Sequence, residues 1–501
     1  MKYESVYPGI DLIYYGNHHQ LEFDFVVAPG ANPRSIKLDM QSKGLRIAKD
    51  GALLIADSDA PMQLHAPNSY QMIGSRRVSI PSRFVAEAGK QVSFEVANYN
   101  HQYPLIIDPS FGYSTYLGGN VYDLSIGLAV DSAGNTYLAG QTFSTTFPTA
   151  DGYSTVGNEN GKGYVAKLDP TGTTLLYSTY VGGSGSDNAA GIAIDGTGGV
   201  YTTGFTTSTD FPVVNGFQAA LGGPYGNAFV MRLDTTQSGA ASLVYSSFIG
   251  GGGNSTSSAG DTGFAIATDG NGLAYVTGQA TSDTSTTPFP TTSTAFQSTL
   301  GSEYGNAFLT VVDTNLSGTD SLVYSTYLGG ASTGFGDYGM GIAVDGAGDA
   351  FITGQTTSDW PTPFPTSSNA YQTNLNSGYG NAYVTEIATA QSGLASLLYS
   401  TYLGGTGDSS TQTGDGAQAI AIDSTGKIYL TGRANSPDFP TTAGAYQVSN
   451  SSSGKAFVAK LDPTQSSNQS LMYSSYLGGS NGELGASILA DNSAIAYIAG
   501  A

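Results

Sequence analysis

The sequence predicts an all-β protein in which a small β-sandwich-like domain precedes a β-propeller, and two observations carry this prediction. The first is a seven-residue motif, Tyr-Ser-(Thr/Ser)-(Tyr/Phe)-(Leu/Val/Ile)-Gly-Gly, that recurs at intervals of 64 to 79 residues. It begins at Tyr113, Tyr177, Tyr245, Tyr324, Tyr399 and Tyr473. The second is an uneven charge: residues 1–110 carry a net charge of −1 and all four histidines, and residues 111–501 carry −20. We therefore expect two domains, 1–110 and 111–501.

The first domain contains short segments in which apolar and polar residues alternate. Residues 21–27, 36–40 and 92–96 show this period of two, and the apolar segment 52–55 follows an Asp-Gly turn. Alternation of this kind is typical of strands with one buried face. We expect a β-sandwich-like module.

Each repeat of the second domain contains four predicted strands. In the first repeat they cover residues 127–131, 136–140, 164–169 and 175–181. They are rich in β-branched and aromatic residues and are bounded by Gly, Asp, Pro and Ser. Apolar residues fall on both faces, as in 457–461, which is typical of sheets buried on both sides. Four antiparallel strands per repeat, stacked around an axis, form the blades of a β-propeller.

The repeats predict a propeller that this sequence does not complete. Five repeats supply all four strands, a sixth supplies two and ends at Ala501, and a lone fourth strand at Tyr113 precedes the first complete repeat. We expect a truncation at the C-terminus; a closed five-bladed ring with an extra hairpin is the alternative. We also expect an incomplete N-terminus, because Met1 lies within what resembles the run-up to the Tyr-Pro-Gly-Ile-Asp motif at 7–11; no signal peptide is seen after Met1.

Composition excludes several classes of function. The absence of cysteine excludes disulfides, thiolate catalysis and cysteine-ligated zinc. The absence of histidine from residues 111–501 excludes a Ser-His-Asp triad and histidine-ligated zinc in the propeller. A net charge of −21 argues against nucleic-acid binding. No apolar run reaches the 18 or so residues of a membrane-spanning helix, so we expect no membrane insertion.

The repeated motifs resemble those of the SBBP repeat, a bacterial β-propeller repeat family. The resemblance is carried by Ala-Phe-Val-Ala-Lys-Leu-Asp at 456–462, Tyr-Ser-Thr-Tyr-Leu-Gly-Gly at 324–330 and Gly-Ile-Ala-Val-Asp at 341–345, and it covers residues 111–501. Residues 1–110 resemble the domain that often precedes these repeats in large exported surface proteins. The resemblance implies an extracellular or cell-surface location and no particular reaction.

An acidic residue stands eight positions before the Asp that ends each first strand. These acids are Asp123, Asp187, Asp261, Asp337, Asp415 and Glu483. One interpretation is a ring of carboxylates that binds Ca²⁺ at one mouth of the propeller. The other is that each acid caps a turn by accepting backbone N–H bonds. We expect no other cofactor.

The connections between blades suggest a binding surface. From the Gly-Gly pair to the following acid, the third to fifth repeats have offsets of 10, 7 and 10 residues, against 4 elsewhere. Phe335 and Tyr338 lie in one of these predicted loops. The single tryptophan, Trp360, follows Asp359 in a neighbouring lengthened loop, between the second and third predicted strands of the same repeat. Exposed aromatic residues beside an acid suit stacking on a sugar ring or on a partner surface.

The sequence therefore predicts a non-enzymatic binding or adhesion scaffold whose partner is a polysaccharide or a surface protein. One alternative is a carbohydrate-active hydrolase or lyase that uses a pair of the 27 acids in the propeller. The other is a purely structural spacer, because propellers host many unrelated functions.

Overall fold

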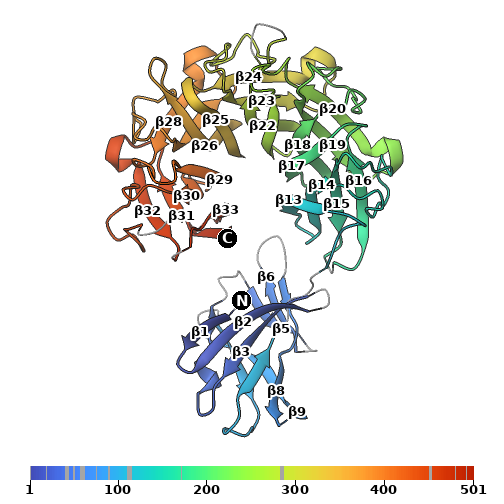
Figure 1. The fold of residues 1–501 in the computed structure, drawn as a ribbon. Coiled ribbons are helices and arrows are strands. Elements are labelled where there is room, and N and C mark those ends of the chain that lie inside the picture. Colours follow the sequence, from blue (N-terminus) through green and yellow to red (C-terminus); the bar gives the residue numbers. More distant parts are fainter. Residues whose placement is uncertain are drawn as a thin grey trace. The chain divides into compact units, whose positions relative to one another are not determined.

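A computed structural model describes residues 2–17, 20–39, 44–48, 51–56, 62–74, 76–87, 91–109, 115–170, 172–282, 287–450, 454–479, 481–491 and 493–501. The chain divides into two compact units. One comprises residues 1–118, 130–137 and 166–177, and the other comprises residues 119–129, 138–165 and 178–501. Apart from five short 3₁₀ turns, the regular structure of these residues is β-strand, which confirms the all-β prediction (Figure 1). None of the helices in the described ranges is long and apolar enough to cross a membrane.

The N-terminal region forms a six-stranded sheet and two three-stranded sheets. The six-stranded sheet has the order β1 (Lys2–Tyr7), β2 (Ile10–Asn17), β3 (Gln20–Val27), β12 (Leu105–Asp108), β8 (Asn68–Ile73) and β9 (Arg76–Ile80). The second sheet has the order β10 (Ser82–Ala86), β11 (Gln91–Val96) and β4 (Leu38–Asp39). The third contains β5 (Gly44–Ile47), β6 (Leu53–Ala56) and β7 (Met62–Leu64).

Aromatic residues from two of these sheets meet in one core. Phe25 of β3 and Phe94 of β11 are buried, and their ring centroids lie 5.8 Å apart. Alternate residues of both strands therefore face a shared interior, as a sandwich requires. The strand predicted at 36–40 is reduced to β4, because the chain first makes a 3₁₀ turn at Pro33–Ser35. Proline suits the start of that turn, and the Asn32 side chain caps it by accepting a hydrogen bond from the Arg34 N–H.

Residues 123–477 form five four-stranded antiparallel sheets, which confirms five complete blades. Blade 1 contains β13 (Asp123–Val130), β14 (Thr136–Thr142), β15 (Lys162–Leu168) and β16 (Leu175–Val181). Blade 2 contains β17 (Asp187–Ile194), β18 (Gly199–Thr206), β19 (Asn227–Asp234) and β20 (Leu243–Ile249). Blade 3 contains β21 (Thr262–Thr268), β22 (Leu273–Ala280), β23 (Asn306–Asp313) and β24 (Leu322–Leu328).

Blade 4 contains β25 (Ala331–Val344), β26 (Asp349–Asp359), β27 (Asn381–Ala388) and β28 (Leu397–Leu403). Blade 5 contains β29 (Gly416–Ile422), β30 (Ile428–Ala434), β31 (Lys455–Leu461) and β32 (Leu471–Leu477). The sixth repeat supplies the hairpin β33 (Gly485–Ala490) and β34 (Ala496–Gly500). The strand predicted at Tyr113 falls within residues 110–114, outside the described residues.

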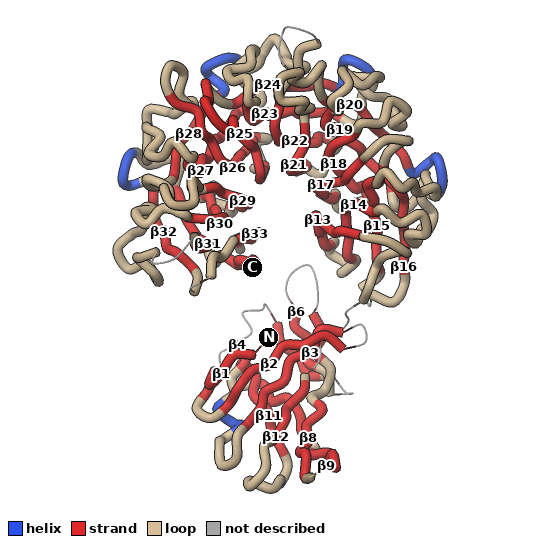
Figure 2. The backbone as a smooth tube through the Cα atoms, in the orientation of Figure 1, coloured by secondary structure: helices blue, strands red, loops and turns tan. Residues whose placement is uncertain are grey.

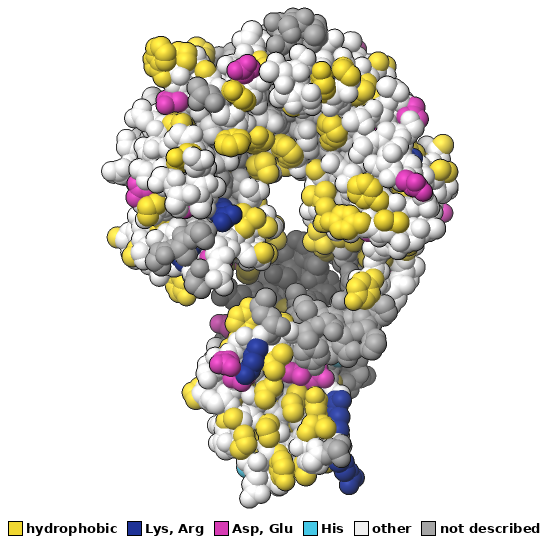
Figure 3. Space-filling model, viewed as in Figure 1, with side chains coloured by type: hydrophobic (Ala, Val, Ile, Leu, Met, Phe, Trp, Pro, Cys, Tyr) yellow, Lys and Arg dark blue, Asp and Glu magenta, His cyan; other side chains and the backbone are white. Residues whose placement is uncertain are grey.

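The blades follow one another in chain order, with the first strand of each blade innermost. Strands β17, β21, β25, β29 and β33 each contact the next. Apolar side chains gather along this inner edge (Figure 3). Four short 3₁₀ turns precede the fourth strands of blades 2 to 5 and lie on the outer rim (Figure 2). They are η2 (Gly239–Ser242), η3 (Gly318–Ser321), η4 (Gly393–Ser396) and η5 (Ser467–Gln469).

The repeated Tyr-Ser-Thr-Tyr motif joins blades to one another and to their own loops. The Tyr245 hydroxyl of blade 2 hydrogen-bonds the Ser321 hydroxyl of blade 3 at 2.7 Å. In the same way, Tyr324 of blade 3 bonds Ser396 of blade 4, and Tyr399 of blade 4 bonds Ser470 of blade 5. The next residue of the motif, Ser246, donates to the Pro212 carbonyl of its own blade at 2.6 Å. The motif that reveals the repeat is thus a structural one.

Candidate functional site

The repeated acids lie at the start of each blade, where the chain enters the first strand. Asp337 is fully buried. Its Oδ1 accepts a hydrogen bond from the Thr356 hydroxyl, and its Oδ2 accepts from the Ser358 hydroxyl, the Gly330 N–H and the Asn306 amide, all within 2.5–3.1 Å. Asn306 and Gly330 belong to the preceding blade. The carboxylate therefore ties two blades together.

The bond from the second glycine of Gly-Gly to the acid is present at all six acids. It joins Gly119 to Asp123, Gly183 to Asp187, Gly251 to Asp261, Gly330 to Asp337, Gly405 to Asp415 and Gly479 to Glu483, over 2.7–3.1 Å. These are the bonds that the capping interpretation expects. In the described ranges, no three Asp, Glu or His side chains lie close enough to share a metal ion.

Burial changes the acidity of four of these carboxyl groups. Desolvation raises the pKa of Asp187, Asp261 and Asp415, and it raises the pKa of Asp337 to about 6. The hydrogen bonds from hydroxyl and N–H groups oppose this shift without cancelling it.

The connection predicted to carry Phe335 and Tyr338 falls within β25, and the prediction of a loop is wrong for Tyr338, which pairs with Gln355. Phe335 lies in an irregular segment of the strand, between the Ser332–Ser358 and Asp337–Thr356 pairs. Ala331 pairs with Asp359, and Ser332 pairs with Ser358, so that β25 and β26 continue as a hairpin beyond the blade. Polar Thr and Ser side chains of β26 satisfy this extension: the Thr357 hydroxyl hydrogen-bonds that of Ser332 at 2.6 Å.

The extension presents Trp360 and Phe335 to solvent. The Trp360 side chain is 83% exposed and that of Phe335 is 65% exposed. Asp359, the last residue of β26, is also exposed. Tyr338 differs from these three: it is partly buried, and its ring lies 6.3 Å from that of Phe264 on the inner strand of blade 3. The structure thus removes Tyr338 from the predicted exposed group.

Tyr304 is an exposed aromatic residue that the sequence prediction missed. The Gln279 amide of blade 3 donates to the carbonyls of Tyr304 and Phe335, at 3.0 and 3.5 Å, and so holds the two segments together. A sequence signal was available, because Tyr-Gly-Asn occurs at 225–227, 304–306 and 379–381, once before each lengthened connection. We call Tyr304, Phe335, Asp359 and Trp360 the hairpin surface.

The hairpin surface offers aromatic faces and one carboxylate beside the extended β25–β26 pair. Aromatic rings stack on the apolar faces of sugars or on apolar partner side chains, and a carboxylate accepts hydrogen bonds from hydroxyl groups. The surface is therefore equipped to bind and hold a ligand.

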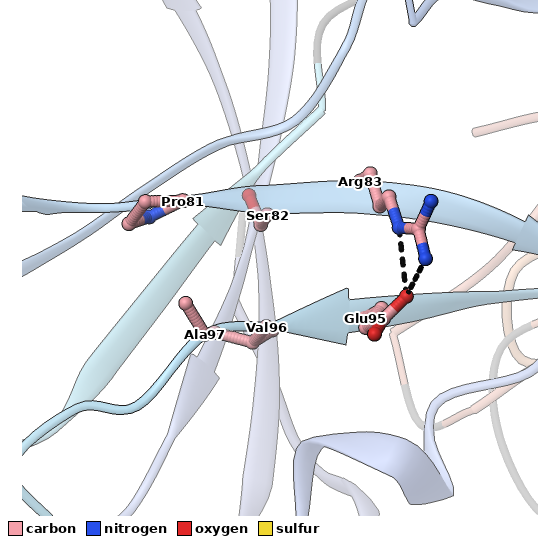
Figure 4. A pocket seen from close by; sticks show the side chains of 6 residues that line it. All are labelled: Pro81, Ser82, Arg83, Glu95, Val96 and Ala97. Atoms are coloured by element: carbon pink, nitrogen blue, oxygen red, sulfur yellow. Dashed lines mark hydrogen bonds and ion pairs between the residues drawn. The ribbon is translucent and has the colours of Figure 1, made fainter.

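A cavity of about 230 Å³ lies on the β10–β11 sheet of the N-terminal region (Figure 4). Its lining includes Arg83 and Glu95, which pair across the two strands, with the Arg83 Nε donating to Glu95 at 2.7 Å. Both side chains are largely exposed, and a solvated ion pair of this kind satisfies its own charges.

Comparisons with known proteins identify both parts of the chain. A domain of unknown function, DUF7948, matches residues 1–110, and the SBBP β-propeller repeat matches residues 176–212 and 323–360. The search of curated proteins found no match.

Two solved structures show faint overall likeness. An extracellular domain from B. thetaiotaomicron is 11% identical with a TM-score of 0.25, and the match covers 100% of this chain and 57% of that one. A Synechocystis apocarotenoid oxygenase mutant is 8% identical with a TM-score of 0.26, over 83% of this chain and 90% of that one. Neither structure is similar enough to indicate the function of this chain. The two family matches and the five four-stranded sheets show that the chain contains SBBP β-propeller repeats and a DUF7948 domain at residues 1–110.

Proposed function

We propose that this protein is a non-enzymatic scaffold at the cell surface or outside the cell, and that the hairpin surface of its propeller binds polysaccharide. The observation that carries the proposal is the exposure of Trp360 and Phe335 at the end of the longest hairpin of the propeller. Grouped exposed aromatic residues mark interaction sites, and aromatic residues dominate binding where a partner buries them.

The chemistry of the propeller supports binding rather than catalysis. The acids at the blade entrances and in the turns, such as Asp337 and Asp423, are each engaged by hydroxyl and N–H groups of the protein itself. A glycosidase needs two carboxyl groups flanking one bond, about 5–10 Å apart. The SBBP resemblance supports the location at the cell surface or outside the cell.

The test is a pull-down of the full chain with insoluble polysaccharides, in which the supernatant is assayed for released sugar. We expect wild-type protein to bind without releasing sugar, and Trp360→Ala and Phe335→Ala each to weaken binding on the order of tenfold. Tyr446→Ala is the matched control, because Tyr446 is an aromatic residue of blade 5 with 82% exposure outside the hairpin surface.

Three results would contradict the proposal. Release of sugar would show an enzyme. Equal loss in all three variants would show non-specific adsorption through aromatic residues. Absence of polysaccharide binding would leave a protein partner or a spacer role as the explanation.

A further inference from the structure

A groove between blades 1 and 2 has a composition that no other blade shares. It has a volume of about 490 Å³ and is lined by the connection between β14 and β15, by the Gly182–Ser184 turn and by Asp210 of blade 2. Lys162, the first residue of β15, lines it with only 8% of its surface exposed. A buried ammonium beside a cavity needs a structural explanation.

In the other four blades a glutamine closes the corresponding position. Each Gln carboxamide oxygen accepts a hydrogen bond from the first glycine of the Gly-Gly pair, at 3.0–3.1 Å. The pairs are Gly250 with Gln218, Gly329 with Gln297, Gly404 with Gln372 and Gly478 with Gln447. An acceptor oxygen therefore belongs at this place in the blade.

Blade 1 has Ser154 in place of the glutamine. The equivalence is fixed by the backbone: the Tyr180 N–H donates to the Ser154 carbonyl as the Phe248 N–H donates to that of Gln218. Serine is too short to reach the glycine, and the described residues give the Gly182 N–H no acceptor. The groove is the space that this exchange opens.

Blade 1 also has a cation where blades 2 to 4 have asparagine. Lys162 stands in register with Asn227, Asn306 and Asn381. Its Nζ donates to the Val156 carbonyl at 2.9 Å, as the Gln218 amide donates to that of Ala220 at 3.0 Å. An ammonium has three donors, and this bond uses one of them.

The groove carries acceptors as well as donors. The Asn158 Oδ1 is buried without a hydrogen-bond partner, while its Nδ2 donates to the Gly183 and Gly185 carbonyls. The Asp210 carboxylate accepts from the Ser184 N–H and hydroxyl at 2.8 and 2.9 Å and remains exposed. A ligand that fits both sets has an anionic oxygen for the donors and hydroxyl groups for the acceptors.

We propose that this groove binds a sugar that carries a carboxylate, such as a uronate residue. The ligand carboxylate takes the place of the missing glutamine oxygen and accepts from the Gly182 N–H and the Lys162 ammonium. Its hydroxyl groups donate to Asn158 Oδ1 and to Asp210. Desolvation lowers the pKa of Lys162, and the charges of Asp187 and Asp210 oppose that shift without cancelling it; a ligand carboxylate beside the ammonium would oppose it further. The proposal is independent of the hairpin surface.

The test is a calorimetric titration of the full chain with glucuronate, with glucose and acetate as comparators. We expect saturable binding of glucuronate and at least tenfold weaker binding of both comparators. Ser154→Gln, which restores the residue of the other blades, and Lys162→Gln should each weaken glucuronate binding at least tenfold. Lys455→Gln is the matched control, because blade 5 has a lysine at the same register but keeps Gln447.

Several outcomes would overturn the assignment. If the binding heats of glucuronate do not saturate with wild-type protein, the groove is not a binding site. If acetate binds as tightly as glucuronate, the site does not recognise the sugar. If glucose binds as tightly, the site does not recognise the carboxylate. Wild-type affinity in both blade 1 variants would place the ligand elsewhere. Thermal unfolding of each variant checks its fold, and Lys162→Gln keeps the test valid if Ser154→Gln unfolds. Trp360→Ala should bind glucuronate normally, which separates this site from the hairpin surface.

Discussion

Blade 4 carries an acid where three other blades carry a cation. Lys167, Arg232 and Lys460 of the third strands lie 4.8–5.3 Å from the ring centroids of Tyr137, Tyr201 and Tyr429. Cation–π contact stabilises such pairs. The corresponding residue of blade 4 is Glu386, which pairs across the sheet with Phe351. Burial and the nearby charges of Asp349 and Asp345 raise the pKa of Glu386 to about 7.

We expect Glu386→Gln to stabilise the protein above pH 7 and to leave it unchanged near pH 4. The folded state holds the Glu386 proton more tightly than the unfolded state, so this group's contribution to stability is present below pH 4.5 and is lost as pH rises to 7. At about 1.4 kcal/mol per pKa unit, the shift from 4.5 to about 7 corresponds to about 3.4 kcal/mol. Solvent screening of this partly exposed group reduces the expected gain at pH 8 to on the order of 2 kcal/mol. Denaturant unfolding at both pH values measures it.

Glu303→Gln provides the control for this prediction, because Glu303 is exposed and lies in a connection of blade 3. The unfolding free energy of the Glu303→Gln variant should equal that of wild type at every pH. An equal gain from Glu386→Gln at pH 4 and pH 8 would refute the titration and point to packing instead.

At the scale of the strand, blades fit together through a pair of residues on each inner strand. A Cβ added to Gly127 of β13 would lie 2.9 Å from Ile192 Cγ2 of the next blade. The isoleucine at this register is buried in blades 3, 5 and 6, at Ile266, Ile420 and Ile488. Blade 1 has Leu128 at the same register, with 64% of its surface exposed. The side chain at this position should therefore contribute more to the stability of the fold in blades 3, 5 and 6 than in blade 1.

Substitution by alanine at this position should have a large effect where the side chain is buried and a small effect where it is exposed. Ile420→Ala should cost about 2–4 kcal/mol of unfolding free energy, because it leaves a cavity between blades 4 and 5. Leu128→Ala should cost less than about 0.5 kcal/mol, as expected for an exposed side chain. Chemical denaturation of both variants measures the difference. Similar losses would mean that Leu128 is covered in solution.

The sequence predicted the regular elements better than the connections, and the physical reason is visible at particular residues. The four strands of each blade follow from their β-branched and aromatic residues and from the Tyr-Ser-Thr-Tyr motif, because each repeat must make the same bonds. Pairing of Ala331 with Asp359 could not be predicted, since it depends on two connections that meet only in the folded blade. The groove at Lys162 arises from an absent glutamine, and an absence shows only when equivalent residues are aligned through their backbone bonds.

At the scale of the whole molecule, two groups of carboxyl groups impose opposite pH dependences. Burial raises the pKa of Asp187, Asp261, Asp337 and Asp415 at the entrances of blades 2 to 5. Hydrogen bonds from backbone and hydroxyl donors outweigh desolvation at turn residues such as Asp195, and they lower the pKa of Asp423 to about 2. The first group therefore resists ionisation, and the second favours it.

The thermal unfolding temperature should accordingly reach its maximum at mildly acidic pH, between about 4 and 6. The raised groups contribute stability that is complete below pH 3.8 and declines as pH rises through their folded pKa, which is about 6 at Asp337. The lowered groups contribute stability that is present above pH 3.8 and lost as pH falls towards 2, as at Asp423. Relief of the net charge of −21 adds to the benefit of mild acid.

Asp337→Asn tests this account, because an amide can keep the bonds from Ser358, Gly330 and Asn306 through its oxygen and donate to the Thr356 hydroxyl through its nitrogen. Scanning calorimetry from pH 3 to 8 should show a smaller fall in unfolding temperature above pH 4 for this variant than for wild type. An unfolding temperature that rises steadily to pH 8 in wild type would refute the assignment of the blade-entrance acids as groups that resist ionisation. If the wild-type unfolding temperature has its maximum at mildly acidic pH but falls equally steeply above pH 4 in the variant, acids other than Asp337 cause the fall.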